Sequence, residues 1–421
     1  MSIIHQIGYK LREQIEKFSG ELSFSFGKVS HRFVTEMLYG ILSSGSVRIT
    51  NISRMLEEPI TLHKTHDRLC RNLQHRRLEA KLERSVLHKA STFFNKETLI
   101  VIDPTDIIKP YARKMEYLAR VHDGSKNSVG NGYWLCQAIG VNQASGKIIP
   151  LVNRLYSSTA PDFISENDHI LDITDNILNA TDYDGIIVMD RGGDRRKLLI
   201  PWSKNENIDY IIRQRGDRHL IYRRGLHLCN DLAAYCDTPY SETVTKIQDG
   251  KIKTYHLSFG FLPVRLPGFK NRQLYLVVVR GFGKKPMMLL TTIKMRKNRK
   301  IIWRIAENYI ARWRIEETIR YIKQSYNLED VRLLTYQRLK NLMNLVLAAS
   351  FFTCVYLGIK ERMKILVGHA LKAAKRLFGI PDFNYYSISD GIKTILTRCA
   401  LGIKKRKPPG DEYLQKKLFN F

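Results

Sequence analysis

Four polar side chains that could take part in a chemical reaction lie along one segment that the sequence predicts to be a helix. They are Tyr309, Arg312, Glu316 and Lys323, and they would fall within about 60° of one another at roughly 100° per residue. One stripe therefore carries a carboxylate flanked by two cations and a phenol. A carboxylate can ligate a metal ion while neighbouring cations hold phosphate oxygens, which is the chemistry of phosphodiester cleavage. Taken alone, the stripe fits better with a solvated helix face bearing ion pairs.

Two aspartates elsewhere in the chain strengthen the chemical interpretation. Asp103 follows the apolar run Leu99–Ile102, and Asp190 follows the run 185–189, so each is expected at the end of a buried strand. Parallel strands bring such terminal carboxylates to one edge of a sheet, where α/β proteins place their sites. With Glu316 they would form an oxygen-rich set suited to Mg²⁺. Asp106 is the alternative to Asp103 as the first carboxylate.

The bulk composition favours a polyanionic partner and an ordered, multidomain chain. Among 421 residues there are 69 Lys and Arg against 40 Asp and Glu, so 69 − 40 gives a net charge of +29. A chain this basic usually binds DNA or RNA. The six cysteines form no C-x-x-C pair, which argues against a zinc ribbon and fits a reducing cytosol. The uncharged stretch 341–359 is long enough for a membrane span, but its asparagines favour a buried core helix, and no membrane partner is expected.

The hydrophobic pattern divides the chain into helical and β-rich regions. Residues 1–95 read as helical and form a candidate DNA-binding region. Within it, 46–56 and 61–73 could be a helix-turn-helix whose second helix exposes basic and polar side chains: Lys64, His66, Arg68, Arg71 and Asn72. Residues 133–141 and 147–155 predict a hairpin, and 162–180 a helix. Residues 206–292 read as a β-rich insertion, and a long helical zone runs from residue 309 towards residue 360.

The signature residues resemble those of the DDE transposases of bacterial insertion sequences, specifically insertion sequence family four. That family's helix carries Tyr, Arg, Glu and Lys at the spacing of Tyr309, Arg312, Glu316 and Lys323. Its Asp-Arg-x-x-Asp motif matches residues 190–194, and its first motif matches residues 103–105. The resemblance covers roughly residues 95–350.

The resemblance implies a ribonuclease H-like mixed α/β sheet core, formed by residues 96–205 and 293–357. The β-rich insertion 206–292 would interrupt this core, and a basic helical region, residues 358–421 with a cluster at Lys404–Lys407, would follow it. Asp103, Asp190 and Glu316 would be the catalytic metal ligands for two Mg²⁺ ions, which Mn²⁺ could replace. The implied DNA contacts are Tyr309, Arg312, Lys323, Arg191 and Arg213.

The activity implied by the resemblance is cut-and-paste transposition. Strand cleavage at transposon-end inverted repeats, often through a DNA hairpin, would be followed by strand transfer into target DNA, with the protein a homodimer on DNA in a bacterial cytoplasm. The alternatives are an inactive DNA-binding descendant and a metal-dependent nuclease that does not join strands. Well-studied relatives use a Trp to stack on a flipped base, and Met287 stands at that position here.

Two roles near the second aspartate stay open from sequence. Asp194 could touch a metal or cap the following helix, and capping is the expectation. Arg213, Arg215 and Arg218 could contact phosphates or pair with Asp209 and Asp217.

Overall fold

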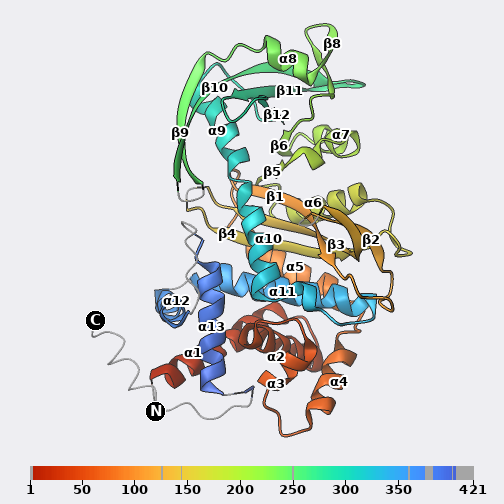
Figure 1. The fold of residues 1–421 in the computed structure, drawn as a ribbon, viewed down its shortest axis with the longest axis vertical. Coiled ribbons are helices and arrows are strands. Elements are labelled where there is room, and N and C mark those ends of the chain that lie inside the picture. Colours follow the sequence, from red (N-terminus) through yellow and green to blue (C-terminus); the bar gives the residue numbers. More distant parts are fainter. Residues whose placement is uncertain are drawn as a thin grey trace.

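The computed structural model describes residues 3–124, 127–143, 145–248, 251–358, 361–374, 383–400 and 402–403. The predicted basic cluster Lys404–Lys407 lies outside these ranges. Figure 1 shows a helical region at the bottom, a twisted sheet above it, and a β-rich part at the top. The first and last helices of the chain lie together in the bottom region, where α1 packs beside α13.

The N-terminal region is helical, as its apolar periodicity predicts. Its helices are α1 (Ile3–Leu22), α2 (Lys28–Ser44), α3 (Ile49–Met55), α4 (Leu62–Asn72) and α5 (Leu78–Ser91). Gly45 ends α2 in a left-handed conformation, φ 59°, which a glycine adopts without steric cost. Thr61 begins α4 by accepting a hydrogen bond from the Lys64 backbone N–H. The two helices of the candidate helix-turn-helix thus correspond to α3 and α4, which pack on each other.

One mixed sheet contains the twelve strands found among the described residues. The strands of its first half are β1 (Leu99–Ile108), β2 (Ala119–Asp123), β3 (Ser128–Val141), β4 (Ile148–Tyr156), β5 (Ile186–Met189) and β6 (Asp209–Arg213). Those of its second half are β7 (His219–Tyr222), β8 (Gly225–Leu228), β9 (Tyr240–Gln248), β10 (Lys251–Leu266), β11 (Phe269–Arg280) and β12 (Met287–Thr291). The order is β2-β3-β1-β5-β6-β12-β11-β10-β7-β8, with β4 on β3 and β9 on β10. Only β1, β5 and β6 pair in parallel, so the sheet is mostly antiparallel.

The predicted β-rich segment 206–292 continues this sheet instead of standing apart from it. Strand β6 pairs in parallel with β5, and β12 pairs with β6, so the ladder passes from the first half of the sheet into the second without a gap. The predicted hairpin is present as β3 and β4. The predicted helix at 162–180 is α6 (Glu166–Ala180), whose N-cap is Ser165. The other helices among these strands are short: η1 (Arg191–Gly193), α7 (Arg196–Lys204) and α8 (Cys229–Tyr235).

Strand β1 does not end at Asp103, contrary to the expectation from the apolar run. It continues to Ile108 because β3 pairs with it along its whole length, from Leu99↔Val141 to Ile108↔Gly132. On the other side, β5 pairs only as far as Val101. Pro104 therefore lies where one edge of the strand has no partner, a position at which proline is tolerated. Asp103 lies within a strand, at the point where its parallel neighbour stops.

The signature segment is two helices rather than one. Helix α9 (Arg299–Ile310) ends before Ala311, and α10 (Trp313–Ser325) begins after Arg312. At the junction, Arg312, Arg314 and Ile315 each donate a backbone bond three residues back instead of four. Such a 3₁₀ turn inside a helical run is a recognised cause of a break. Figure 1 shows α9 over the upper part of the sheet and α10 continuing below it; α9 contacts β5 and β6, and α10 contacts β1 and β3.

Helix α11 (Tyr336–Cys354) is the central core helix. By length and composition the segment 336–358 could cross a membrane, but 94% of its apolar window is buried inside the fold. It packs against β4 on one side and against α2 and α5 on the other, and so joins the sheet to the N-terminal helices. The buried Asn341 side chain donates to the Leu73 and His75 carbonyls. The remaining elements are η2 (Leu328–Asp330), η3 (Tyr356–Gly358), α12 (Glu361–Ala373) and α13 (Tyr385–Cys399).

Candidate active site

Asp103 of β1 and Asp190, which directly follows β5, lie side by side where these neighbouring parallel strands stop pairing. The last paired residues of β1 and β5 are Val101 and Val188, and each aspartate follows two positions later in its own chain. Strand β6 extends the row, because Met189 pairs with Ile212 and Arg213 follows. The register thus aligns two carboxylates and a guanidinium across three strands.

The third predicted carboxylate, Glu316, reaches this row through Arg312. It lies in the first turn of α10, and the Arg312 guanidinium donates to it at 2.6 Å while lying 4.0 Å from the Asp103 carboxylate. One guanidinium therefore links both acidic groups. Among the residues that the structure describes, no three His, Cys, Asp or Glu side chains converge closely enough to hold one metal ion.

The pKa of Asp103 reflects both its burial and the nearby carboxylates. Burial is the largest influence and raises the pKa of Asp103 to about 7, with further upward contributions from the charges of Asp190 and Glu316. Arg312 acts in the opposite direction but does not compensate for the others. In the metal-free site, burial and the neighbouring carboxylates together favour the protonated form of Asp103. Oxygen-only donors of this kind suit a hard divalent ion, so the donor set fits Mg²⁺.

Two guanidinium groups lie near the ring of Tyr309, beside these carboxylates. The Arg213 and Arg312 guanidinium carbons are 5.9 Å and 5.8 Å from the centre of its ring. The Tyr309 hydroxyl and the Arg312 Nε are both buried and lack a hydrogen-bond partner among the described residues. Buried polar groups normally have partners. The Arg312 Nε–H, a donor, and the Tyr309 hydroxyl, which can donate and accept, could therefore bind a polar ligand.

Lys323 completes the signature from the last turn of α10. Its ammonium lies 3.6 Å from the Asp106 carboxylate of β1. The alternative first carboxylate thus has a defined role as the partner of Lys323. Asp103, Glu316 and Lys323 all line an open cleft of about 920 Å³. The sequence did not predict the other polar residues that line this cleft, because no motif links them to the site. They are Arg320, Gln324, Asn327, Glu329 and Asp330.

Asp194 does not cap a helix, contrary to the prediction. It is 1% exposed, forms an ion pair with Arg218 and accepts the Arg215 backbone N–H at 2.7 Å. The N-cap of α7 is Arg195, without a side-chain cap bond. Asp194 thus holds the segment after β6 against η1. The described partner of Arg218 is Asp194 and not the predicted Asp209 or Asp217. Asp209 pairs with Arg272 instead. By contrast, Asp190 does cap the turn after β5 by accepting the Gly192 N–H at 2.7 Å, and Arg191 is exposed.

Met287 is a core residue. It begins β12, pairs with Val279 of β11, and is 6% exposed. In this conformation its side chain packs inside the sheet and offers little surface on which a base could stack.

The candidate recognition helix α4 keeps only part of its predicted polar face. Arg68 pairs with Glu36, which is 1% exposed, and with Glu58, so it fastens α4 to α2. Lys64 and Arg71 are exposed. A role for α4 in reading DNA therefore stays a prediction that depends on these other side chains.

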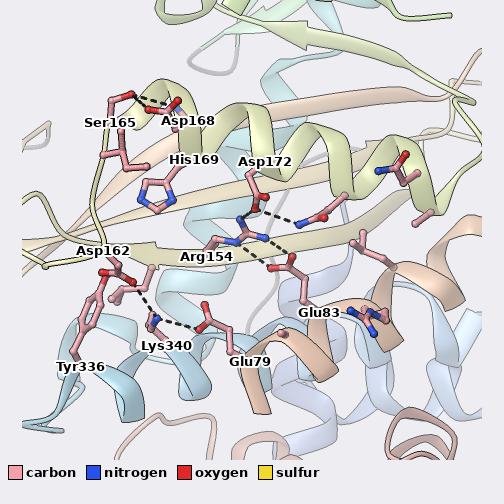
Figure 2. A pocket seen from close by; sticks show the side chains of 18 of the residues that line it. Glu79, Glu83, Arg154, Asp162, Ser165, Asp168, His169, Asp172, Tyr336 and Lys340 are labelled. Atoms are coloured by element: carbon pink, nitrogen blue, oxygen red, sulfur yellow. Dashed lines mark hydrogen bonds and ion pairs between the residues drawn. The ribbon is translucent and has the colours of Figure 1, made fainter. Parts of the chain in front are cut away.

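A second pocket, of about 730 Å³, lies between α5, α6 and α11 and shares no lining residue with the cleft (Figure 2). Figure 2 shows its two central cations held by carboxylates from different elements. Arg154 bonds to Glu83 and Asp172, and Lys340 lies 3.4 Å from Glu79 and 3.8 Å from Asp162. These ion pairs, in which four carboxylates surround two cations, join the helices around the sheet.

Comparison with known proteins identifies the broader family of the chain. Residues 95–352 match the family model described as Transposase DDE domain. No curated protein matches the chain. The cryo-EM structure of the piggyBac transposase synaptic complex with hairpin DNA is similar at 10% sequence identity and a TM-score of 0.42, covering 99% of this chain and 84% of that one. That similarity is too distant to carry an inference. The family match spans more than half of the chain and contains the cleft residues, so the protein belongs to the DDE-domain transposases.

Proposed function

We propose that this transposase cuts and joins DNA at the site formed by β1, the residue directly after β5 and the first turn of α10, beside the open cleft, with divalent metal ions held by Asp103, Asp190 and Glu316. The observation that carries the proposal is the alignment of Asp103 in β1 with Asp190 directly after the parallel strand β5, with Glu316 linked to Asp103 through Arg312. Mg²⁺ suits these oxygen donors, and Mn²⁺ is the expected substitute. When bound, such ions would activate the attacking oxygen and stabilise the leaving one.

The chain's own side chains would bind and orient the DNA backbone. Arg312 and Lys323 would each exchange a carboxylate partner for a phosphate oxygen. Tyr309 would donate its unpaired hydroxyl to a neighbouring oxygen. Arg213, on the same row as the carboxylates, and Arg191, exposed beside Asp190, would contact adjacent phosphates.

We further propose cut-and-paste transposition of an insertion sequence of family four, with transposon-end inverted repeats and target DNA as partners and a homodimer on DNA. The match of Tyr309, Arg312, Glu316 and Lys323 to the family signature supports this. A ribonuclease H-like core and a bacterial cytoplasmic location belong to the same proposal. Met287 is buried where relatives carry the base-stacking Trp, so any hairpin intermediate would be processed without base stacking at that position.

The test is DNA cleavage and joining by wild type, Glu316→Gln and the control Glu307→Gln. The control removes an equal charge from the exposed face of α9. Glu316→Gln is expected to bind DNA but not to cleave the transposon end in Mg²⁺, while Glu307→Gln cleaves like wild type. Cleavage by Glu316→Gln at the wild-type rate would refute the assignment of the site.

Two further results would separate the proposal from its alternatives. A plasmid-joining reaction with pre-cut 3′-hydroxyl ends should yield joined products, whereas a simple nuclease would yield none. DNA binding by wild type without any Mg²⁺-dependent cutting would identify an inactive descendant.

A further inference from the structure

Both signature cations are paired with the site's own carboxylates. Arg312 donates to Glu316 at 2.6 Å and lies 4.0 Å from Asp103, and Lys323 lies 3.6 Å from Asp106. The groups suited to phosphate binding therefore neutralise groups suited to metal binding. In the free protein, these cations and their carboxylate partners occupy one another, so a phosphate or a metal ion must displace a pairing in order to bind.

Arg312 affects the candidate metal ligands more directly than Lys323 does, because it lies beside both Glu316 and Asp103. Its guanidinium lies close to both carboxylates, so a divalent ion that entered between Asp103 and Glu316 would be repelled by a positive charge already there. No three acidic, His or Cys side chains converge as a metal site within the described ranges, in keeping with a guanidinium inserted between Asp103 and Glu316.

The pairing of Arg312 is also incomplete. Within the part of the chain that the structure describes, its Nε is buried without a hydrogen-bond partner, as is the neighbouring Tyr309 hydroxyl. An unsatisfied buried donor costs free energy that a suitable ligand recovers. A phosphate oxygen could accept from these donors, so phosphate binding would draw the guanidinium away from Glu316.

We propose that Arg312 is an internal counter-ion that closes the metal site in the free protein, so that DNA phosphate and divalent metal bind cooperatively. This inference rests on the proposed function of the same site. When Arg312 turns to a phosphate, Glu316 and Asp103 become available to a metal ion. By linkage, DNA must raise metal affinity by the same factor by which metal raises DNA affinity. The free protein would thus bind metal weakly until DNA is present.

The test measures Mn²⁺ binding by electron paramagnetic resonance, which does not depend on catalysis. The proteins are wild type, Arg312→Ala and the control Arg320→Ala. Arg320 lies on the same helix, lines the same cleft and pairs with Glu317, so its removal lowers the charge of the cleft equally without removing a described ion pair of Asp103 or Glu316. Without DNA, Arg312→Ala should bind Mn²⁺ about tenfold more tightly than Arg320→Ala, within the usual range of coupling between two ligands.

A second arm measures the coupling directly. A short duplex DNA of arbitrary sequence, at low salt so that it binds non-specifically, should raise the Mn²⁺ affinity of wild type and of Arg320→Ala. It should have little effect on Arg312→Ala, because that site is already open. Circular dichroism of each variant establishes that it is folded, and the wild-type measurement with and without DNA stands even if a variant fails to fold.

The outcomes distinguish the inference from the function on which it rests. If Glu316→Gln binds Mn²⁺ as wild type does, with and without DNA, the metal site itself is wrong. If Glu316→Gln loses binding but Arg312→Ala and Arg320→Ala bind Mn²⁺ equally, the site stands and the counter-ion role is overturned. Absence of any DNA effect on wild-type Mn²⁺ affinity would also overturn the coupling.

Discussion

Replacing Asp103 by Asn should remove a specific pH dependence of stability from the metal-free protein. The pKa of Asp103 is raised from 3.8 to about 7, mainly by burial. A carboxyl with a raised folded-state pKa binds its proton more tightly in the folded state, so its stabilising contribution is full below pH 3.8 and is lost as pH rises through about 7. For one group with these pKa values, the contribution is about 3 kcal/mol at pH 5 and close to zero at pH 8.

The assay is urea denaturation in EDTA at about pH 5 and pH 8, where this linkage is respectively large and small. Wild type should lose about 2–3 kcal/mol more unfolding free energy between these pH values than Asp103→Asn does. Asp190→Asn is an informative companion. It removes one of the charges that raise the Asp103 pKa but leaves the larger effect of burial, so it should retain most of the wild-type dependence. If Asp103→Asn kept the full wild-type loss of stability, the raised pKa would not belong to Asp103.

Three further substitutions probe separate parts of the structure. Asp194→Ala should lower the unfolding free energy by about 3–5 kcal/mol, because it strands Arg218 in a largely buried position; a loss below about 1 kcal/mol in urea denaturation would contradict the structural role. Gly391→Ala should destabilise by about 1–3 kcal/mol, since an added Cβ would overlap the Ala370 carbonyl oxygen of α12, and an unchanged midpoint would show that α12 and α13 do not pack this closely. Lys323→Ala should weaken DNA binding and lower the slope of log affinity against log salt by about 0.9, and an unaltered slope in a salt titration would remove Lys323 from the phosphate contacts.

Local patterns predicted the strands that carry the candidate ligands, but not how far those strands extend. The apolar runs before Asp103 and Asp190 correspond to the paired parts of β1 and β5. The extension of β1 to Ile108 depends on the length of β3, a partner more than twenty residues away in the chain. A strand edge defined by a distant partner leaves no mark in the local sequence.

The helix signature was predicted as one element because its residues are compatible with continuous helix. The break at Ala311 and Arg312 contains neither Gly nor Pro, the usual local signals for a break. It lies where the chain passes from contacts with β5 and β6 to contacts with β1 and β3. Tertiary packing, and not helix propensity, accounts for its position.

The ion pairs of the site were the least predictable feature. Asp194 was expected to cap a helix because aspartate before a helix commonly does so. Its partner Arg218 comes from a later turn that only the folded sheet brings near. The pairing of Lys323 with Asp106 likewise joins residues that are distant in the chain. Motif spacing identifies such residues as chemically significant, but their partners depend on the three-dimensional fold.

The central claim, that Asp103, Asp190 and Glu316 share bound metal, can be tested most directly by iron-mediated cleavage of the polypeptide. Fe²⁺ would replace Mg²⁺ in the complex with DNA, and ascorbate and peroxide would generate radicals that cut the backbone beside the metal. The account predicts cuts near residues 103, 190 and 316, all suppressed by excess Mg²⁺. Cuts confined to one of these segments, or clustered elsewhere in the chain, would contradict it.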